Sequence, residues 1–443
     1  MQQNKTASQR KTINPVYWVP TAYFAMGLPF IAINLVSVFM FKDLGISDTQ
    51  ITFWTSLIMM PWTLKFLWSP FLEMYRTKKF FVLVTELLSG ILLGVVAFSL
   101  FFDYFFAISI STMAVIAFSG ATHDIACDGV YMAELNKEDQ AKYIGVQGAF
   151  YNVAKLVANG GLVALAGMLA EHFGAIEGAS IDANKGAYSS AWTIIFAVIA
   201  AIMVLIGIYH IKMLPSTQVP ATGKKTTSEI VTDLLNVIGN FFTKRHIVYY
   251  IFFIILYRLA EGFIMKVAPL FLRASREVGG LGLSLKEIGT LNGVFGSAAF
   301  VIGSLLGGIF VARYGLKKTL FTLCCVFNLP FIAYTFLAVV QPTSLYLIGT
   351  CITMEYFGYG FGFVGLTLFM MQQIAPGKHQ MSHYAFASGI MNLGVMLPGM
   401  VSGYFSDLLG YRSFFIYVLI ATIPAFLMTY FIPFTYDDSK KKK

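Results

Sequence analysis

The sequence predicts an all-α membrane protein with twelve transmembrane helices arranged as two six-helix halves. Its composition, its count of long apolar segments and an internal repeat support this fold class. Of the 443 residues, 57% are hydrophobic and 12% are charged, and the mean hydropathy is +0.71. A water-soluble chain of this length would need far more charged surface, so a multi-pass membrane protein is indicated.

Twelve segments are long and apolar enough to cross a bilayer, which takes about 20 residues. Six precede a polar stretch and six follow it. In order they are 15–41, 49–72, 80–102, 105–133, 141–170, 187–213, 247–272, 284–312, 318–340, 344–374, 381–408 and 411–434.

The polar stretch divides the chain into three parts. An N-terminal six-helix bundle occupies 1–213, a cytoplasmic linker 214–246, and a C-terminal six-helix bundle 247–443. Apolar residues in the linker recur at helical spacing and predict an amphipathic helix that lies on the membrane surface and ties the halves together. These residues are Ile230, Leu234, Val237, Ile238 and Phe241.

Two short sequences recur at nearly equal offsets. LGISDTQI at 44–51 returns as LGLSLKEI at 281–288, an offset of 237 (281 − 44). GMLAEHFG at 167–174 returns as GYFSDLLG at 403–410, an offset of 236 (403 − 167). Such a repeat predicts two parallel halves, with a substrate site at their interface near the middle of the membrane.

Lysine and arginine set the expected orientation, with both termini in the cytoplasm. The basic residues therefore serve topology, and the net charge of +9 does not indicate a nucleic-acid partner. Most of them fall on the predicted inner side. The outer loops hold Lys42, Lys185, Arg273, Arg276, Lys286 and Arg412.

Charged residues inside the apolar segments predict transport of something polar, because such charges are costly in a bilayer and face a cavity or a partner. Asp124 and Asp128 are four residues apart and share a helix face. Two carboxylates this close do not both ionise easily, so they are candidates for proton coupling, with His123 as a third. The alternatives are an ion pair between Asp124 and Lys65 and a packing role for His123.

A second group of charges predicts substrate contacts. Arg258 lies near the middle of the seventh segment, where a guanidinium suits a carboxylate or phosphate. Its alternative is a pair with Glu261, three residues away. Lys155 in the fifth segment has the same two interpretations, with Glu86 as its alternative partner. Lys65 also belongs with these candidates.

The tenth segment contributes an acid and two aromatic residues. Glu355 is a candidate to accept sugar hydroxyls or to answer Arg258 across a cavity. Tyr356 and Tyr359 are candidates to stack on sugar rings, with ordinary packing or lipid contact as the alternative. The neighbouring glycines, at 358, 360 and 362, let helices approach closely.

Motifs for other chemistry are missing from the sequence. It has no Walker loop, no metal-ligand cluster and no nucleophile with a base at suitable spacing, so neither an enzyme nor an ATP-driven pump is expected, and no cofactor or metal. The four cysteines, Cys127, Cys324, Cys325 and Cys351, lie within apolar segments and are interpreted as small buried side chains.

Several motifs resemble the major facilitator superfamily. GIFVARYGLKK at 308–318 resembles its signature between helices 8 and 9, although Ala312 stands where the signature has aspartate. PWTLKFLWSP at 61–70, HDIACDG at 123–129 and GGL at 160–162 resemble the AmpG branch, which also holds acetyl-coenzyme A transporters and some siderophore permeases. That branch commonly has glutamine where this chain has His123. The similarity covers most of the chain.

The resemblance implies a major facilitator fold and a proton-coupled secondary transporter. It would import peptidoglycan-derived amino-sugar or muropeptide fragments across the bacterial cytoplasmic (inner) membrane, as part of peptidoglycan recycling. The expected partners are that small molecule, protons and the lipid bilayer, and the expected state is a monomer. Alternatives are a carrier for a siderophore, acetyl-coenzyme A or another anionic metabolite, and a membrane receptor that does not transport.

Overall fold

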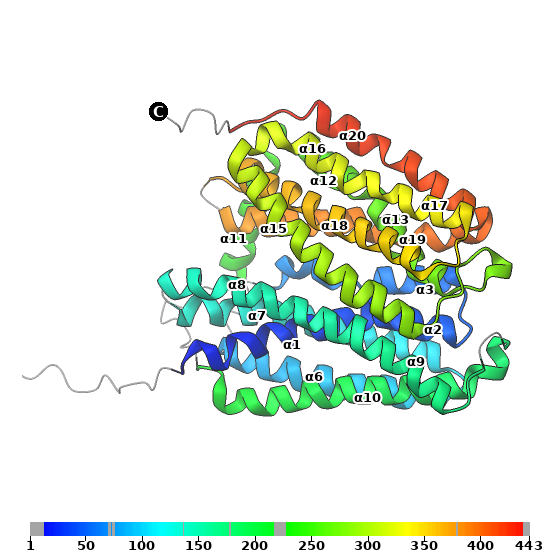
Figure 1. Ribbon diagram of the computed structural model, residues 1–443. Coiled ribbons are helices and arrows are strands. Elements are labelled where there is room, and N and C mark those ends of the chain that lie inside the picture. Colours follow the sequence, from blue (N-terminus) through cyan, green and yellow to red (C-terminus); the bar gives the residue numbers. More distant parts are fainter. Residues whose placement is uncertain are drawn as a thin grey trace, which may run out of the picture.

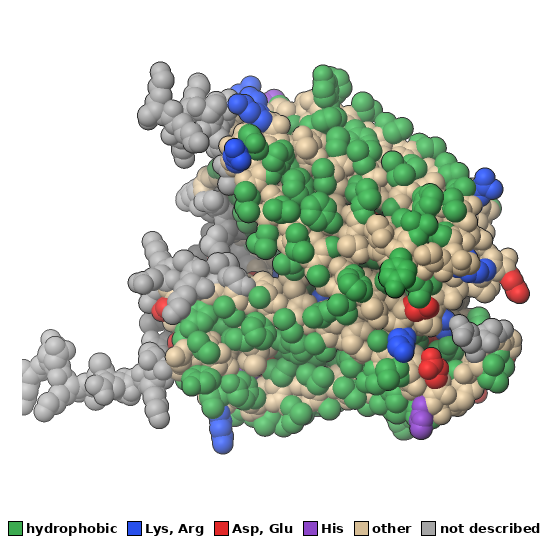
Figure 2. All heavy atoms as spheres, viewed as in Figure 1, with side chains coloured by type: hydrophobic (Ala, Val, Ile, Leu, Met, Phe, Trp, Pro, Cys, Tyr) green, Lys and Arg blue, Asp and Glu red, His purple; other side chains and the backbone are tan. Residues whose placement is uncertain are grey.

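The computed structural model describes residues 13–69, 72, 76–135, 137–176, 179–216, 227–377 and 380–436. Over these ranges the chain is helical and contains no β-strand. The helices share one general direction and form two lobes, α1 to α10 in one and α12 to α20 in the other (Figure 1). Hydrophobic side chains cover the sides of both lobes, and charged ones gather toward the two ends (Figure 2). That distribution suits a bilayer around the middle of the protein.

The first lobe contains the helices predicted from the first six segments. Several crossings are interrupted by a π-helical or 3₁₀ turn. The elements are α1 (Val19–Ile31), η2 (Ala32–Val36), α2 (Ser37–Asp43), α3 (Asp48–Leu57), α4 (Met60–Leu64), η3 (Lys65–Leu67), α6 (Lys78–Ser99), α7 (Phe105–Glu134), α8 (Lys137–Lys155), η4 (Leu156–Leu162), α9 (Val163–His172) and α10 (Ile181–Met213).

Helix α11 (Thr227–Phe242) lies in the predicted linker. Its last turn packs against the start of α19 (Gln380–Ala421), where the ring centres of Phe241 and Phe386 lie 4.7 Å apart. His383 on α19 adds a contact of 3.2 Å between its Nε2 and the carbonyl oxygen of Val237. The apolar residues of α11 therefore contact the second lobe at its end. The linker residues 217–226 lie outside the described ranges.

The second lobe repeats the pattern of broken crossings. In addition to α19, its elements are α12 (Ile247–Tyr257), α13 (Leu259–Arg273), α14 (Leu285–Ile288), η6 (Gly289–Gly296), α15 (Ser297–Tyr314), α16 (Leu316–Asn328), η7 (Leu329–Phe331), α17 (Ile332–Val340), α18 (Leu345–Phe369), η8 (Met370–Ile374) and α20 (Ile423–Tyr430).

Nine helices in the described ranges are long and apolar enough to cross a membrane. One of them, Ser382–Tyr430, is two crossings joined at Gly410, whose φ of 71° and ψ of 156° are not helical. The tenth predicted segment is present as α18, which is rich in glycine and tyrosine. The second is also present, but it is not the single apolar span expected from the sequence. It breaks between α3 and α4, where Pro61 cannot continue the hydrogen-bond ladder.

Local geometry confirms the internal repeat. Gly45 and Gly282 occupy the same place in the two copies, and both have positive φ, 84° and 65°. Two residues later in each copy, Ser47 and Ser284 cap the following helix by accepting a hydrogen bond from its backbone. The second repeat ends on Gly174 and Gly410, with φ of 91° and 71°. Glycine suits each turn because it has no Cβ to clash.

The turns at Gly45 and Gly282 lie at one end of the molecule, here called the repeat face. The start of α1, helix α11 and the end of α20 lie at the other end, here called the linker face (Figure 1). Contacts between the lobes are numerous at the repeat face. Arg273 Nε donates to Asp43 Oδ1 at 2.7 Å, and Tyr411 OH donates to Asp48 Oδ2 at 2.7 Å.

The tightest contact between the lobes joins η4 and η6. Gly160 and Gly293 meet backbone to backbone, so that a Cβ on Gly293 would lie only 2.5 Å from Gly160 N. The two crossings pack along the π-helical segments and also between α9 and α14. The lobes are thus held together firmly toward the repeat face.

Candidate functional site

Lys65 and Asp124 meet inside the first lobe. Lys65 begins the 3₁₀ turn η3, and its Nζ donates to Asp124 Oδ2 on α7 at 3.3 Å. The lysine side chain is 32% exposed and the aspartate 13%, so the pair reaches solvent. Within the described residues Asp124 Oδ1 has no hydrogen-bond partner. The ion pair weighed in the sequence analysis is therefore present, and it leaves one carboxylate oxygen free for a proton or a ligand.

Asp128 lies one turn further along α7 in a different environment. Its Oδ1 accepts a hydrogen bond from Tyr23 OH on α1 at 2.8 Å and a longer one from Gln147 Nε2 on α8 at 3.5 Å. Both donors are neutral. Asp124 faces a cation and Asp128 faces neutral donors, so the two acids are not equivalent.

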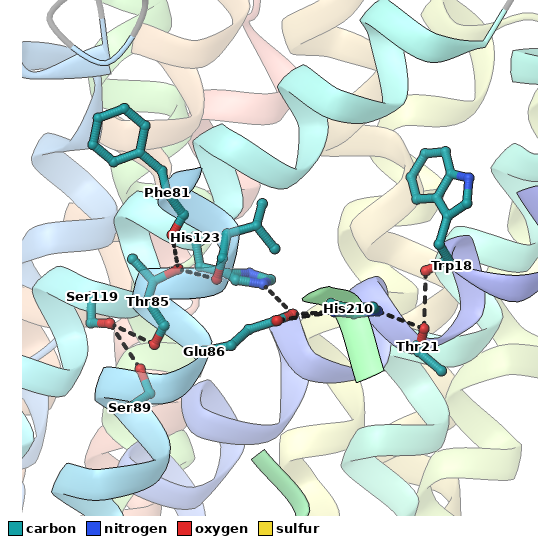
Figure 3. Close-up of polar contacts among 10 residues, drawn as sticks. Trp18, Thr21, Phe81, Thr85, Glu86, Ser89, Ser119, His123 and His210 are labelled. Carbon is teal, nitrogen blue, oxygen red and sulfur yellow. Dashed lines mark hydrogen bonds and ion pairs between the residues drawn. The ribbon is translucent and has the colours of Figure 1, made fainter. Parts of the chain in front are cut away.

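His123 does not join this pair. Its ring points toward α6, where Nε2 lies 3.2 Å from Glu86 Oε1 (Figure 3). Glu86 also accepts from His210 Nδ1 on α10 at 2.7 Å. Glu86 thus has two histidine partners, and its expected alternative pairing with Lys155 is not formed. A salt bridge needs the two groups within reach, and the Glu86 carboxylate is enclosed by α6, α7 and α10.

Arg258 and Glu261 form a bidentate pair in the second lobe. The seventh predicted crossing breaks at Arg258, between α12 and α13, and the guanidinium extends toward the first turn of α13. Its Nε and Nη2 donate to the two oxygens of Glu261 at 2.6 and 2.5 Å. The Arg258 Cζ also lies 5.2 Å from the centre of the Phe363 ring. The pair is buried, and the ion-pair partner of Arg258 is Glu261 and not Glu355.

Lys155 reaches from the first lobe into the second. Its Nζ lies 5.3 Å from the ring centre of Phe300 on α15 and 5.2 Å from that of Tyr356 on α18. A cation over aromatic faces is attracted by their quadrupoles. Glu355, the residue before Tyr356, is buried and within electrostatic range of Lys155 and Glu261. An ammonium, two rings and a carboxyl group therefore converge between the lobes.

Tyr359 lies one turn from Glu355 and contacts the Arg258–Glu261 pair. Its ring packs on Phe300, Phe327 and Phe363, with ring centres 5.0, 5.7 and 5.8 Å apart. The ring is thus already covered on several sides. Tyr356, which is likewise partly buried, lies beneath the Lys155 ammonium.

Sequence reasoning missed several residues of this region. Lys266 is completely buried and donates to the carbonyl oxygens of Asn34 and Thr55, at 3.2 and 3.3 Å, across the lobe boundary. Phe300 was missed because an apolar ring in an apolar helix carries no signal. His210 and Lys266 had one, since a titratable residue inside a crossing marks a functional position by default. Among the described residues, no three His, Cys, Asp or Glu side chains group as metal ligands would.

Sequence comparison matches this chain to known transporters. The profile of the Major Facilitator Superfamily matches residues 21–374 and 280–443. The chain is 23% identical over 414 residues to the anhydromuropeptide permease of Escherichia coli K12, covering 91% of this chain and 77% of the relative. It is 24% identical over 420 residues to the putative transporter AmpG 4 of Rickettsia conorii, covering 91% and 93%.

Solved structures show the same fold at low sequence identity. A variant of the nucleoside transporter NupG superposes with a TM-score of 0.70 at 13% identity, covering 94% of this chain and 99% of that one. A D-xylose-proton symporter superposes with a TM-score of 0.70 at 12% identity, covering 95% and 98%. The agreement extends over nearly the whole chain and confirms the predicted fold class.

Proposed function

Because this chain belongs to the Major Facilitator Superfamily, we propose that it is a proton-coupled importer of anhydromuropeptides or their amino-sugar fragments. The observation that carries the proposal is the convergence of Lys155, Glu355 and Tyr356 between the lobes, beside the Arg258–Glu261 pair. A muropeptide offers sugar rings for the aromatic face and carboxylates for the cations. The similarity to the anhydromuropeptide permease supports this substrate class.

Proton coupling is assigned to Asp124 in this proposal. Asp124 forms an ion pair with Lys65, whereas Asp128 is bound by neutral donors, and Asp124 Oδ1 has no hydrogen-bond partner among the described residues. Taking up a proton neutralises Asp124 and releases Lys65, which is then free to interact with an anionic substrate. Asp128, held by Tyr23 and Gln147, serves to keep α1, α7 and α8 in place.

The division at 213 and 246 into two bundles and a linker is part of the same proposal. Closure at the repeat face and the solvent reaching Lys65 fit an arrangement that opens toward the linker face. We place that face in the cytoplasm and the protein, as a monomer, in the bacterial inner membrane. The positive-inside bias of the loops supports this orientation.

Uptake measurements with the purified protein in proteoliposomes test the function. An inward proton gradient should drive accumulation of a labelled anhydromuropeptide, and unlabelled amino-sugar fragments should compete. Siderophores and acetyl-coenzyme A form the comparison set. Uptake of one of these in place of the muropeptide would redirect the proposal to another anionic cargo. Tight binding without any uptake would instead indicate a receptor.

Substitution of Arg258 by glutamine separates recognition from structure. If Arg258 exchanges Glu261 for a substrate carboxylate, Arg258→Gln should weaken binding of a muropeptide at least about tenfold more than binding of its neutral sugar fragment, since a charge-assisted bidentate pair is lost only for the former. Binding isotherms for both ligands on the same variant give the ratio. Equal losses, with a lowered melting temperature, would assign Arg258 to structure, because Glu261 is then buried without its partner.

Cysteine labelling tests the orientation. In a cysteine-free background, a cysteine at Tyr346, which is 91% exposed, should react with a membrane-impermeant maleimide added to intact cells. A cysteine at the exposed Ser228 of α11 should react only after permeabilisation. The reverse pattern would invert the proposed topology.

A further inference from the structure

Glu86 and His210 form a buried pair that the proposed transport site does not use. Both side chains are completely buried, on α6 and α10 of the first lobe. His210 Nδ1 lies 2.7 and 2.9 Å from the two Glu86 oxygens. A carboxylate and an imidazole in such contact can share one proton, with the charge either separated or cancelled inside the pair.

The other ring nitrogen of His210 meets a hydroxyl group. Thr21 Oγ1 on α1 lies 2.8 Å from His210 Nε2, 3.2 Å from the carbonyl oxygen of Trp18 and 3.4 Å from that of Tyr17 (Figure 3). A threonine hydroxyl carries one hydrogen and two lone pairs, so it donates to only one of these three acceptors at a time. The direction of the Thr21 hydroxyl therefore decides which form of His210 it satisfies.

Two complete hydrogen-bond arrangements follow from this geometry. In the first, neutral His210 donates from Nδ1 to Glu86 and accepts at Nε2 from Thr21. In the second, doubly protonated His210 donates from both nitrogens, and Thr21 turns its hydrogen to the carbonyl of Trp18. The pair gains one proton between the two forms, and no buried polar atom loses its partner.

His123 cannot alternate between two protonation forms that both have complete hydrogen bonding. Its Nε2 contacts Glu86, while its Nδ1 is buried and has no partner among the described residues. A proton added at Nδ1 would create a buried N–H without an acceptor, which is costly. His123 therefore fits a fixed neutral form that donates to Glu86, and the exchangeable proton belongs to His210.

We propose that Glu86 and His210 form a second proton-holding site that exchanges its proton with the linker face through Thr21. Tyr17, one turn before Thr21, is 56% exposed, and Thr21 itself is partly buried, so the hydroxyl connects the buried pair to that face. A hydronium ion at the linker face can give its proton to Thr21 Oγ1 as the Thr21 hydrogen passes to His210 Nε2, which leaves water behind and changes the pair from a net charge of −1 to zero. Release of the proton to the same face is this transfer in reverse.

Other titratable groups lie around the pair. Helix α7 presents His123 and Cys127, and Asp124 and Asp128 directly follow these two residues. Helix α1 presents Tyr23, whose hydroxyl is bound to Asp128. Helix α6 carries Lys79, which binds carbonyl oxygens at the end of α10. His123, which contacts Glu86, directly precedes Asp124, the proposed coupling acid. The role of Glu86 and His210 in transport rests on the proposed function, whereas the existence of the proton site does not.

Histidine-selective ¹⁵N labelling of the protein in lipid bilayers reads the site directly. The His210 signals, identified by their loss in His210→Gln, should show both the neutral and the doubly protonated form when spectra are recorded from pH 9 down to pH 5. In Glu86→Gln the ratio of the doubly protonated to the neutral form at a given pH should fall at least fivefold, because its counter-charge is gone. A wild-type His210 signal that stays in one form in all of these spectra would overturn the site.

Two variants test the hydroxyl and supply the controls. Thr21→Val has no group to accept from a doubly protonated His210, so that form should fall at least fivefold, while Thr21→Ser should titrate like wild type. Ser89→Ala, on the same helix as Glu86, removes a neutral buried hydrogen bond to Ser119 on α7 and is the matched control for disturbed packing. Equal titration of Thr21→Val and Thr21→Ser would exclude the hydroxyl switch.

Proteoliposome measurements test the link to transport. Protons taken up per substrate should fall in Glu86→Gln relative to wild type and stay at the wild-type value in Ser89→Ala. An unchanged proton count, with a titrating His210, would overturn the role in transport. If the wild-type protein moves no muropeptide, the proposed function fails, and the labelling experiment still decides whether the proton site exists.

Discussion

Replacing Asp124 with asparagine should abolish accumulation driven by a proton gradient. Asparagine has nearly the same shape, so Lys65 keeps a hydrogen-bond acceptor, but the side chain no longer takes up a proton. For each proton carried with the substrate, a gradient of one pH unit sustains about tenfold accumulation, because one unit equals about 1.4 kcal/mol. The ratio for Asp124→Asn should fall to one.

The measurement is uptake of labelled muropeptide into proteoliposomes under an imposed pH gradient. Asp103→Asn is the matched control, since Asp103 is exposed in the loop before α7 and should leave accumulation unchanged. Size-exclusion profiles of both variants monitor folding. Wild-type accumulation by Asp124→Asn would remove Asp124 from proton coupling and leave its contact with Lys65 as a structural ion pair.

Replacing Gly293 with alanine should disrupt closure at the repeat face. The added methyl group would overlap the backbone of Gly160, which cannot move aside as a flexible side chain would. Overpacking of this kind costs about 1–3 kcal/mol, so the closed arrangement should lose about 5- to 150-fold in population. Transport should fall with it, because the protein no longer reaches this arrangement readily.

Alanine substitutions at two other glycines provide controls with smaller steric overlap. An alanine at Gly160 would approach Gly293 Cα at 3.3 Å, a tight but tolerable contact, and one at Gly308 would meet nothing within 4 Å. Cysteines at Thr49 and Asp407, which are hydrogen-bonded across the lobes, report closure through a short crosslinker. Crosslinking should decrease in the order Gly308→Ala, Gly160→Ala, Gly293→Ala. Equal crosslinking in all three would contradict the steric argument.

Much of the architecture was predictable because apolar length and turn chemistry are local signals. The crossings, the linker helix and the repeat all follow from stretches of adjacent residues. The break between α3 and α4 was missed, although Pro61 marks it, because the surrounding segment stays apolar enough to suggest one continuous span. Hydropathy measures length and does not detect an interrupted hydrogen-bond ladder.

Apart from the pair of Lys65 with Asp124, the contacts of the candidate site were predictable only within single helices. Arg258 and Glu261 are three residues apart, so their pairing was among the alternatives considered. The partners of Glu86 were not, because His123 and His210 lie on two other helices and their approach depends on helix rotation. Lys155 likewise meets Phe300 and Tyr356 through the packing of the two lobes. Contacts of this kind require three-dimensional coordinates.

The backbone contact of Gly160 with Gly293 gives the molecule mechanical leverage. From Gly293 to Tyr314 the helix extends roughly 30 Å, at a rise of about 1.5 Å per residue. A rotation of about 10° around the glycine contact would displace the far end of α15 by about 5 Å, close to the rise of one helical turn. A pivot without side chains thus converts a small angular change at one end into a large displacement at the other.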